Sequence, residues 1–310
     1  MSKPVIRVED LTVVYKKRLS RAEVRAVSNL GFEVNEGEVV GFLGPNGAGK
    51  SSTIKAMMGF LFPTSGRIEV LGHPAGSTAA KKDLGYLPEV ALYYPFMKAR
   101  ELLRLYGGLA GLARRELRQC TAEVIEMVGL SGRENALLKT YSKGMQQRLG
   151  IAQALIGKPR LLVLDELSAG LDPLGRRDLR RILRTLREEG RTIFFSSHEL
   201  SEVEMLCDRI IIINRGRKVV ECPLGDLVRP LGGFQIIFKD HERVPPLPRQ
   251  PEKLADGTLR LHLAPEDQPH TILRELVLSE VEIVEFHSER GSLEDHFVRI
   301  IQEDDAHSAV

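Results

Sequence analysis

The stretch that decides the fold of this chain is Gly44-Pro45-Asn46-Gly47-Ala48-Gly49-Lys50-Ser51-Ser52. It has the pattern G-x-x-x-x-G-K-S and follows the apolar run Val39–Leu43, so it predicts a strand, a glycine-rich turn and a helix that begins near Lys50. The glycines allow consecutive backbone N–H groups to point into one concavity, where they bind phosphate oxygens. The helix N-terminus adds partial positive charge, so we predict a phosphate-binding loop.

Two side chains of this loop have specific roles in binding a nucleotide. Lys50 reaches the β- and γ-phosphates of a nucleoside triphosphate, and the Ser51 hydroxyl is a ligand for Mg²⁺. The alternative is a glycine-rich turn that arose by chance. The preceding strand, the full spacing and the Lys-Ser pair together favour the phosphate loop.

Length and composition set limits on the rest of the protein. A chain of 310 residues suggests about two domains, and 43% hydrophobic with 28% charged residues is typical of a soluble globular protein. The formal net charge is only +2, so nothing in the bulk charge favours a nucleic-acid partner. No apolar run approaches the ~20 residues that span a bilayer. If the protein works at a membrane, we expect it to do so through a partner.

Strands and helices alternate along much of the chain, which predicts a parallel α/β sheet. The apolar run Leu161–Leu164 is typical of a central strand covered on both faces. Further strands are predicted over 5–15, 26–34, 67–70, 192–196 and 210–213, and helices over 173–189 and 199–206. A turn is predicted at 214–216. The region 77–157 has mainly helical patterns, with a helix over 101–112 that Gly107-Gly108 should weaken, and it suggests a subdomain growing out of the core.

After about Gly225 the character of the sequence changes. Strands are predicted over 234–238, 259–263 and 281–286, and helices over 271–278 and 293–302, with the end at 303–308 frayed. This pattern predicts a small α+β appendage. We therefore expect a first domain over 1–228, with a helical subdomain at about 89–157, and an accessory domain over 229–310.

Two adjacent acids, Asp165 and Glu166, follow the buried strand Leu161–Leu164. Charges there are costly unless they bind a cation or take part in chemistry. In phosphate-loop proteins the first acid helps to hold Mg²⁺, and a second is placed to polarise an attacking water. An acidic strand end or a helix cap explains either acid alone but explains the pair poorly. His198 follows the next strand and is expected near the same sheet edge, although a lone histidine is usually structural.

Five motifs occur in a characteristic order. They are Gly44–Ser52, Tyr141–Arg148, Leu161–Glu166, Ala169–Asp172 and Ser197-His198. In this order they resemble the ATP-binding subunits of ABC transporters, over roughly residues 4 to 228. The resemblance implies an α/β fold, with a P-loop NTPase core of ABC type, antiparallel β and α-helical subdomains and the small C-terminal α+β appendage.

The resemblance also implies roles for individual residues. Tyr15 resembles the aromatic residue that stacks on adenine, although a buried strand tyrosine is a fair alternative. Ser142 and Gly144 match the signature that binds the γ-phosphate held by the opposite subunit, and their place before an expected helix over 145–156 suits an anion. Asp165 resembles the Mg²⁺-linked acid, Glu166 the general base, and His198 the residue that contacts γ-phosphate and water. Asp172 resembles the loop that connects the two active sites of the dimer.

The sequence departs from the commonest family pattern at several positions. Lys143 and Met145 replace Gly and Gln in the signature, and Leu167-Ser168 replaces Pro-Thr after the general base. Glu89 stands where most members carry a glutamine that senses Mg²⁺ and the membrane partner, and a carboxylate there still ligates Mg²⁺. These departures and the ending 291–297 resemble the ABC-2 branch, whose members are chiefly exporters.

We therefore expect a subunit that binds ATP and Mg²⁺, pairs with a second copy of itself and drives membrane-spanning permease subunits from the cytoplasmic face of the membrane. The unusually apolar run Leu92–Met97 is the predicted partner surface, and subdomain core is the equal alternative for any single residue in it. A soluble ABC-type ATPase acting on ribosomes or DNA is the second interpretation, and it usually carries two cassettes or a long coiled coil. A third is a nucleotide-binding regulator that hydrolyses little.

Overall fold

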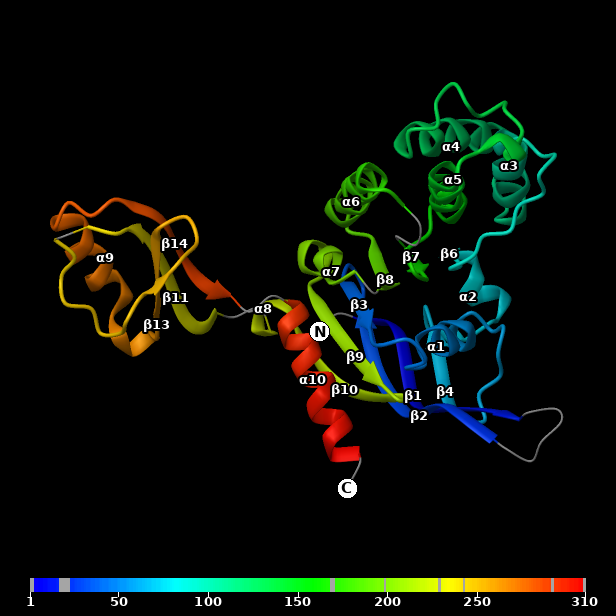
Figure 1. The fold of residues 1–310 in the computed structure, drawn as a ribbon. Coiled ribbons are helices and arrows are strands. Elements are labelled where there is room, and N and C mark those ends of the chain that lie inside the picture. The colour runs from blue at the N-terminus through cyan, green and yellow to red at the C-terminus, as the bar shows by residue number, and fades with distance from the viewer. Residues whose placement is uncertain are drawn as a thin grey trace. The chain divides into compact units, whose positions relative to one another are not determined.

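The computed structural model describes residues 3–16, 23–167, 171–197, 199–227, 230–241, 243–290 and 293–308. The chain forms two compact units (Figure 1), the first comprising the residues up to Leu224 together with those from His307 onward, and the second spanning Gly225–Ala306. In these described ranges no helix is both long and apolar enough to cross a membrane.

The first unit is built on a six-stranded sheet with the order β10-β9-β3-β8-β7-β6. Its strands are β3 (Val39–Leu43), β6 (Leu84–Leu87), β7 (Leu161–Leu164), β8 (Thr192–Ser196), β9 (Arg209–Asn214) and β10 (Arg217–Pro223). All except β10 run parallel to their neighbours. Every residue of β3, β7 and β8 is buried, because helices and a second sheet cover the two faces.

Strand β6 lies within the region 77–157 that is expected to be mainly helical, so the sequence does not predict it as a strand. The edge strand β10 is likewise not predicted. It forms a hairpin with β9 through Arg215 (φ 46°) and Gly216 (φ 79°), a pair of positive φ angles that is typical of a tight hairpin turn. The turn is visible in the sequence at 214–216. The strand after it mixes charged and apolar residues without alternation, so its pattern carries no strand signal.

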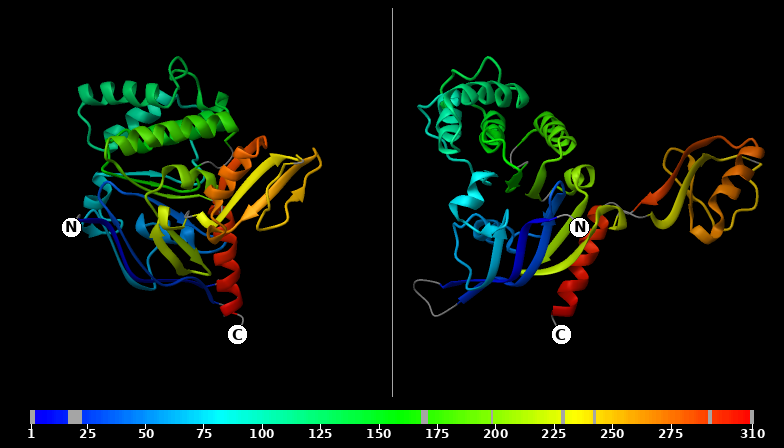
Figure 2. Two further views of the ribbon diagram at one scale, coloured as in Figure 1. Left: turned by 90° about the vertical axis from the view of Figure 1, so that its left-hand side faces the viewer. Right: turned by 180° about the vertical axis from the view of Figure 1, so that it is seen from behind.

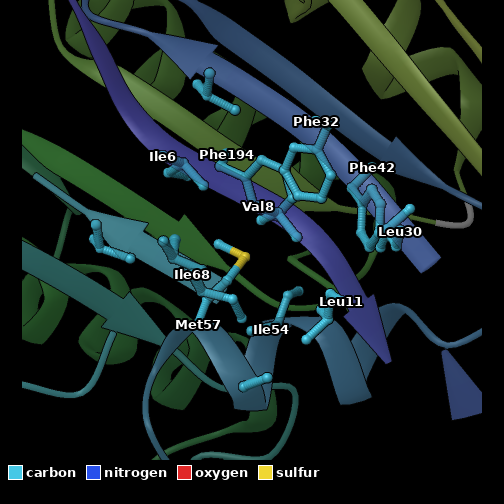
Figure 3. Packing of buried hydrophobic residues seen from close by; sticks show 14 of the residues in the cluster. Ile6, Val8, Leu11, Leu30, Phe32, Phe42, Ile54, Met57, Ile68 and Phe194 are labelled. Atoms are coloured by element: carbon cyan, nitrogen blue, oxygen red, sulfur yellow. The ribbon is translucent and has the colours of Figure 1, made fainter. Parts of the chain in front are cut away.

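A second, antiparallel sheet has the order β2-β1-β4-β5. It comprises β1 (Pro4–Lys16), β2 (Glu23–Asn35), β4 (Ser65–Val70) and β5 (His73–Pro74). Figure 3 shows how its inner face packs against the first sheet and helix α1 (Lys50–Met57). At the centre of this core, the ring of Phe32 lies 5.7 Å from those of both Phe42 and Phe194, so three strands are fixed to one another around the phosphate loop.

Helices α3 (Ala99–Leu109), α4 (Arg114–Met127) and α5 (Lys143–Leu155) lie in sequence between β6 and β7 and gather at the end of the first unit away from β1, β2 and β4 (Figures 1 and 2). Helix α3 continues through Gly107-Gly108 and ends at Leu109, before the expected end at 112. A Cβ on Gly107 would lie 2.3 Å from a side-chain carbon of Leu117, so this glycine allows α3 and α4 to approach closely. The remaining helices of this unit are α2 (Thr78–Lys82), η1 (Leu138–Thr140), α6 (Pro173–Glu188) and α7 (Leu200–Leu206).

The second unit has a sheet of order β12-β13-β11-β14. After α8 (Leu224–Leu227) come β11 (Pro230–Lys239), β12 (Glu252–Lys253), β13 (Thr258–Leu263), η2 (Pro265–Asp267), α9 (Pro269–Leu278), β14 (Ile283–Arg290) and α10 (Leu293–Ser308). Helix α9 buries Ile272 and Leu276 in the same cluster as Ile236 and Phe238 of β11.

Two expectations for the second unit are corrected. The last strand begins at Ile283 rather than Val281, because Val281 N–H donates to the carbonyl of Leu276 and so ends α9. The end 303–308 is helical rather than frayed, because α10 continues to Ser308. An Arg299–Glu303 ion pair one turn apart supports that continuation.

Candidate nucleotide-binding site

The phosphate loop lies between the buried strand β3 and helix α1, which begins at Lys50 as the sequence predicts. Two of its glycines, Gly44 and Gly49, lie where a side chain would clash with neighbouring backbone. A Cβ on Gly44 would lie 2.3 Å from the backbone oxygen of Ile213, and one on Gly49 would lie 2.5 Å from that of Ala26. Gly49 also has a φ of 107°. The loop is therefore pressed against neighbouring backbone and its shape is fixed.

A cavity of about 580 Å³ opens over this loop. It brings together most of the residues that the sequence singles out, from four separate regions of the chain. The lining residues are Tyr15, Val24, Ala26, Pro45, Asn46, Gly47, Ala48, Gly49, Lys50, Ser51, Ser52, Glu89 and Glu166. The volume, and a lining that includes the phosphate loop and the N-terminus of α1, suit a nucleoside triphosphate.

Lys50 lies in the floor of the cavity and is almost fully buried. Its ammonium donates to the backbone oxygens of Gly44 at 2.6 Å and Pro45 at 3.4 Å, and it lies 3.7 Å from a carboxylate oxygen of Glu166. The loop lysine and the acid after β7 therefore face each other across the site.

Asp165 follows β7 and is 2% exposed. It accepts a hydrogen bond from the Ser196 hydroxyl at 2.7 Å, and Ser196 Oγ in turn accepts one from the Glu166 N–H at 2.9 Å. Burial raises the pKa of Asp165 above its usual value, the Ser196 hydrogen bond opposes this shift, and the charges of Glu166 and Glu89 add to it. Negative charge thus accumulates at this edge of the sheet.

The residues at this edge fit a magnesium ion. Asp165 offers a buried carboxylate whose charge is poorly compensated, and the Ser51 hydroxyl and the Glu89 carboxyl line the adjoining cavity. Hydroxyl and carboxylate oxygens are the ligands that Mg²⁺ prefers. The negative charge of this edge also acts on Tyr86: burial raises the pKa of Tyr86 to about 12, and the charges of Asp165 and Glu89 contribute to that rise.

Tyr15 lies at the opposite side of the cavity, at the end of β1. It is 40% exposed, and its hydroxyl lies 3.2 Å from Ser52 Oγ. The alternative of a buried strand tyrosine is therefore wrong, and the ring is available to a ligand.

Ser142, Gly144 and Asp172 do not line this cavity. Ser142 is the exposed N-cap of α5, where its hydroxyl accepts from the Met145 N–H at 3.2 Å. Asp172 is the exposed N-cap of α6 and accepts from the Gly175 N–H at 2.7 Å. The signature residues and the phosphate loop of one chain thus belong to different surfaces.

His198 lies outside the described residues. The residues on either side of it are described: the Glu199 N–H donates to Ser197 Oγ at 2.9 Å, and Arg176 of α6 forms an ion pair with Glu199 at 2.6 Å. Ser196, which holds both acids, is a site residue that the sequence motifs do not identify. A polar residue that ends a buried strand next to the acidic one is the signal that identifies it.

Comparison with known proteins identifies the family. The ABC transporter family model matches residues 27–169. BcrA, the bacitracin transport ATP-binding protein of Bacillus licheniformis, is 35% identical over 309 residues, covering 96% of this chain and 97% of BcrA. An uncharacterised ABC transporter ATP-binding protein of Synechocystis sp. is 34% identical, covering 96% of this chain and 85% of that protein. The chain belongs to the ABC transporter ATP-binding proteins.

Further similarities support this ABC transporter assignment. LnrL, the linearmycin resistance ATP-binding protein of Bacillus subtilis, is 38% identical over 75% of this chain and 74% of its own. A solved ATP-binding subunit of an ABC transporter has a TM-score of 0.66 at 30% identity, over 74% of this chain and 93% of that one. The expected ABC-type fold is thus confirmed. The protein is an ATP-binding and ATP-hydrolysing subunit of an ABC transporter, and the comparisons give no support to a soluble ATPase acting on ribosomes or DNA.

Proposed function

We propose that this subunit powers an exporter and works as a head-to-tail dimer that encloses ATP between its two copies. The observation that carries the proposal is the separation of Ser142 and Gly144 from the cavity over the phosphate loop. Each chain presents half of a site on one surface and the complementary half on another. A bacterial ABC transporter cassette solved as a dimer, with a TM-score of 0.65 at 25% identity, supports this arrangement.

In the proposed closed state, each residue of the site has one task. The loop from Gly44 to Ser52 binds the phosphates through its backbone, and Lys50 neutralises charge on the β- and γ-phosphates. Tyr15 stacks on the adenine ring. Ser142 and Gly144 of the second copy bind the γ-phosphate from the other side.

Glu166 acts as the general base of hydrolysis. Its carboxylate accepts a proton from the water that attacks the γ-phosphorus as the bond to the β-γ bridging oxygen breaks. His198 contacts the γ-phosphate and that water, and Asp172 connects the two sites. Mg²⁺ held by Ser51, Asp165 and Glu89 supplies stabilisation of the phosphate charges when bound.

The permease-binding surface is proposed on the apolar run Leu92–Met97 that follows Glu89. Leu92, Tyr94 and Phe96 are 89%, 71% and 75% exposed, whereas Tyr93 turns inward. Exposed aromatic groups of this size on a monomer mark an interaction site. A separate cavity of about 290 Å³, lined by Phe60, Tyr86 and residues of α3 and α5, offers space for a few side chains of a permease segment.

Two of the relatives support the direction of transport. BcrA is a bacitracin transport protein and LnrL confers linearmycin resistance, and both roles are consistent with removal of a compound from the cell. A subunit that couples to such a permease lies on the cytoplasmic face of the membrane, where ATP is available.

The dimeric site is tested by complementation between two inactive variants. Lys50→Ala lacks the phosphate-loop cation but keeps the signature, and Ser142→Arg blocks the signature but keeps the loop. Each alone should release phosphate at a background rate. A mixture should recover activity, because mixed dimers contain one complete site. A mixture as inactive as its components, with mixed dimers demonstrated, would reject the shared site.

A further inference from the structure

Gln147 of helix α5 lies inside the protein, at 8% exposure. Its side-chain amide donates through Nε2 to the backbone oxygen of Leu167 at 2.7 Å, and this hydrogen bond is buried. Leu167 is itself fully buried and directly follows Glu166. Helix α5 therefore holds the segment that carries the acid facing the phosphate loop.

The backbone of Glu166 is held on its other side by β8, since its N–H donates to Ser196 Oγ at 2.9 Å. Between these two attachments Glu166 has a φ of 49°, in the left-handed region. A residue with a side chain keeps that conformation only where the surroundings impose it. Removing one attachment should let the backbone relax and turn the carboxylate away from the site.

We propose that Gln147 is a positioning residue for hydrolysis, which links the signature helix to the catalytic carboxylate of the same chain. The proposal rests on the proposed role of Glu166 as general base. Ser142 caps α5 five residues before Gln147, a distance of about 7.5 Å along a helix. When Ser142 engages ATP held by the other copy, a shift of α5 is transmitted to the Leu167 carbonyl and so to Glu166.

The first test replaces the amide by an apolar group of similar shape. Gln147→Met should lower kcat between about 10- and 100-fold, because a misplaced general base costs rate. The KM for ATP should change less than about twofold, since the phosphate loop is untouched. Gln146→Met is the matched control: Gln146 is the preceding residue and also donates to a backbone oxygen, that of Tyr141 at 3.3 Å, away from Glu166. It should keep kcat within about twofold.

A second variant tests the hydrogen bond itself. In Gln147→Glu the ionised side chain has no proton to donate to Leu167, whereas the protonated acid has one, and burial favours protonation. The ratio of the kcat of this variant to that of wild type should therefore rise as the pH falls from about 8 to about 6. A loss caused by general disorder would not follow pH in this way. Binding of a fluorescent ATP analogue confirms that each variant is folded.

The proposal is overturned if Gln147→Met keeps the wild-type kcat, or if its kcat and ATP affinity fall together while Gln147→Glu shows a flat ratio over pH. Glu166→Gln separates this failure from failure of the proposed function. If Glu166→Gln is inactive and Gln147→Met is fully active, the role of Glu166 stands and the role of Gln147 does not. If Glu166→Gln hydrolyses ATP normally, the proposed function itself fails.

Discussion

Replacing Asp165 by Asn should stabilise the protein and abolish ATP hydrolysis at the same time. Asp165 is buried and forms no ion pair with any residue in the described ranges, so its charge is costly; Glu166 and Glu89 increase that cost, and the charge of Lys55 offsets only part of it. Asn has the same shape and keeps a side-chain oxygen that can accept from the Ser196 hydroxyl, as the Asp165 carboxylate does at 2.7 Å. It removes only the charge, which we propose is needed for Mg²⁺.

The expected gain in stability of Asp165→Asn follows from the burial of the Asp165 carboxylate. Relief of one poorly compensated carboxylate is expected to raise the free energy of unfolding by about 1 kcal/mol at neutral pH, in the range of other stabilising replacements at functional sites. For a unit of this size that corresponds to an increase in Tm of about 2–4 °C. ATP hydrolysis should fall to background, because the amide is a weak ligand for Mg²⁺.

The sign of the pH dependence follows from the raised pKa. The folded protein binds the Asp165 proton more tightly than the unfolded chain does, so wild type is relatively more stable below the ordinary value of 3.8 and loses that contribution as the pH rises through the raised pKa. The variant has no such titration. Its advantage should therefore be largest at neutral pH and disappear towards pH values below 3.8.

The assay is urea unfolding without nucleotide or metal at neutral and acidic pH. Asp178→Asn is the control, because Asp178 forms an ion pair with Arg148 at 2.6 Å and its loss should destabilise the protein. A variant at 165 that is less stable than wild type at neutral pH, or a gain that does not change with pH, would refute the reasoning.

Three further predictions concern the loop, the base contact and the permease surface. Gly49→Ala should reduce the free energy of unfolding by about 1–3 kcal/mol and abolish binding of a fluorescent ATP analogue, because Gly49 has a positive φ and the new Cβ would lie 2.5 Å from a backbone oxygen. Gly47→Ala should reduce the free energy of unfolding less, because no atom lies within 4 Å of its Cβ. Equal losses for the two variants would contradict the steric argument. Tyr15→Ala should weaken ATP affinity, measured by titration, by about 1–3 kcal/mol, whereas Tyr15→Phe should keep most of the affinity because it keeps the ring that stacks on the base. If Tyr15→Phe binds ATP as weakly as Tyr15→Ala, the hydroxyl rather than the ring contributes the affinity. Tyr94→Asp or Phe96→Asp should abolish co-purification with the permease and leave basal ATPase activity unchanged, and undiminished co-purification would remove these positions from the interface.

Much of the core was predictable because its signals are local. The phosphate loop with β3 and α1, and the buried strand β7 with its two acids, follow from spacing and apolar runs in the sequence. The parallel order of β3, β7 and β8 then brings their ends to one edge, where the predicted residues meet.

The parts that sequence reasoning missed depend on contacts between distant segments. The hydrogen bond of Gln147 to Leu167 joins residues 20 apart, and that of Ser196 to Asp165 joins residues 31 apart. Gly107 looks like a helix breaker until its contact with Leu117 is known. Strand β10 has no periodic pattern and is specified by the turn before it. Such features require three-dimensional packing to be seen.

The central claim is that two copies of this chain close around ATP. The most direct test is the solution mass of Glu166→Gln, which should bind ATP without hydrolysing it. With ATP and Mg²⁺ we expect twice the mass of the chain. Without nucleotide, or when Ser142→Arg is combined with Glu166→Gln, we expect the mass of one chain. A strictly monomeric Glu166→Gln with ATP demonstrably bound would contradict the account.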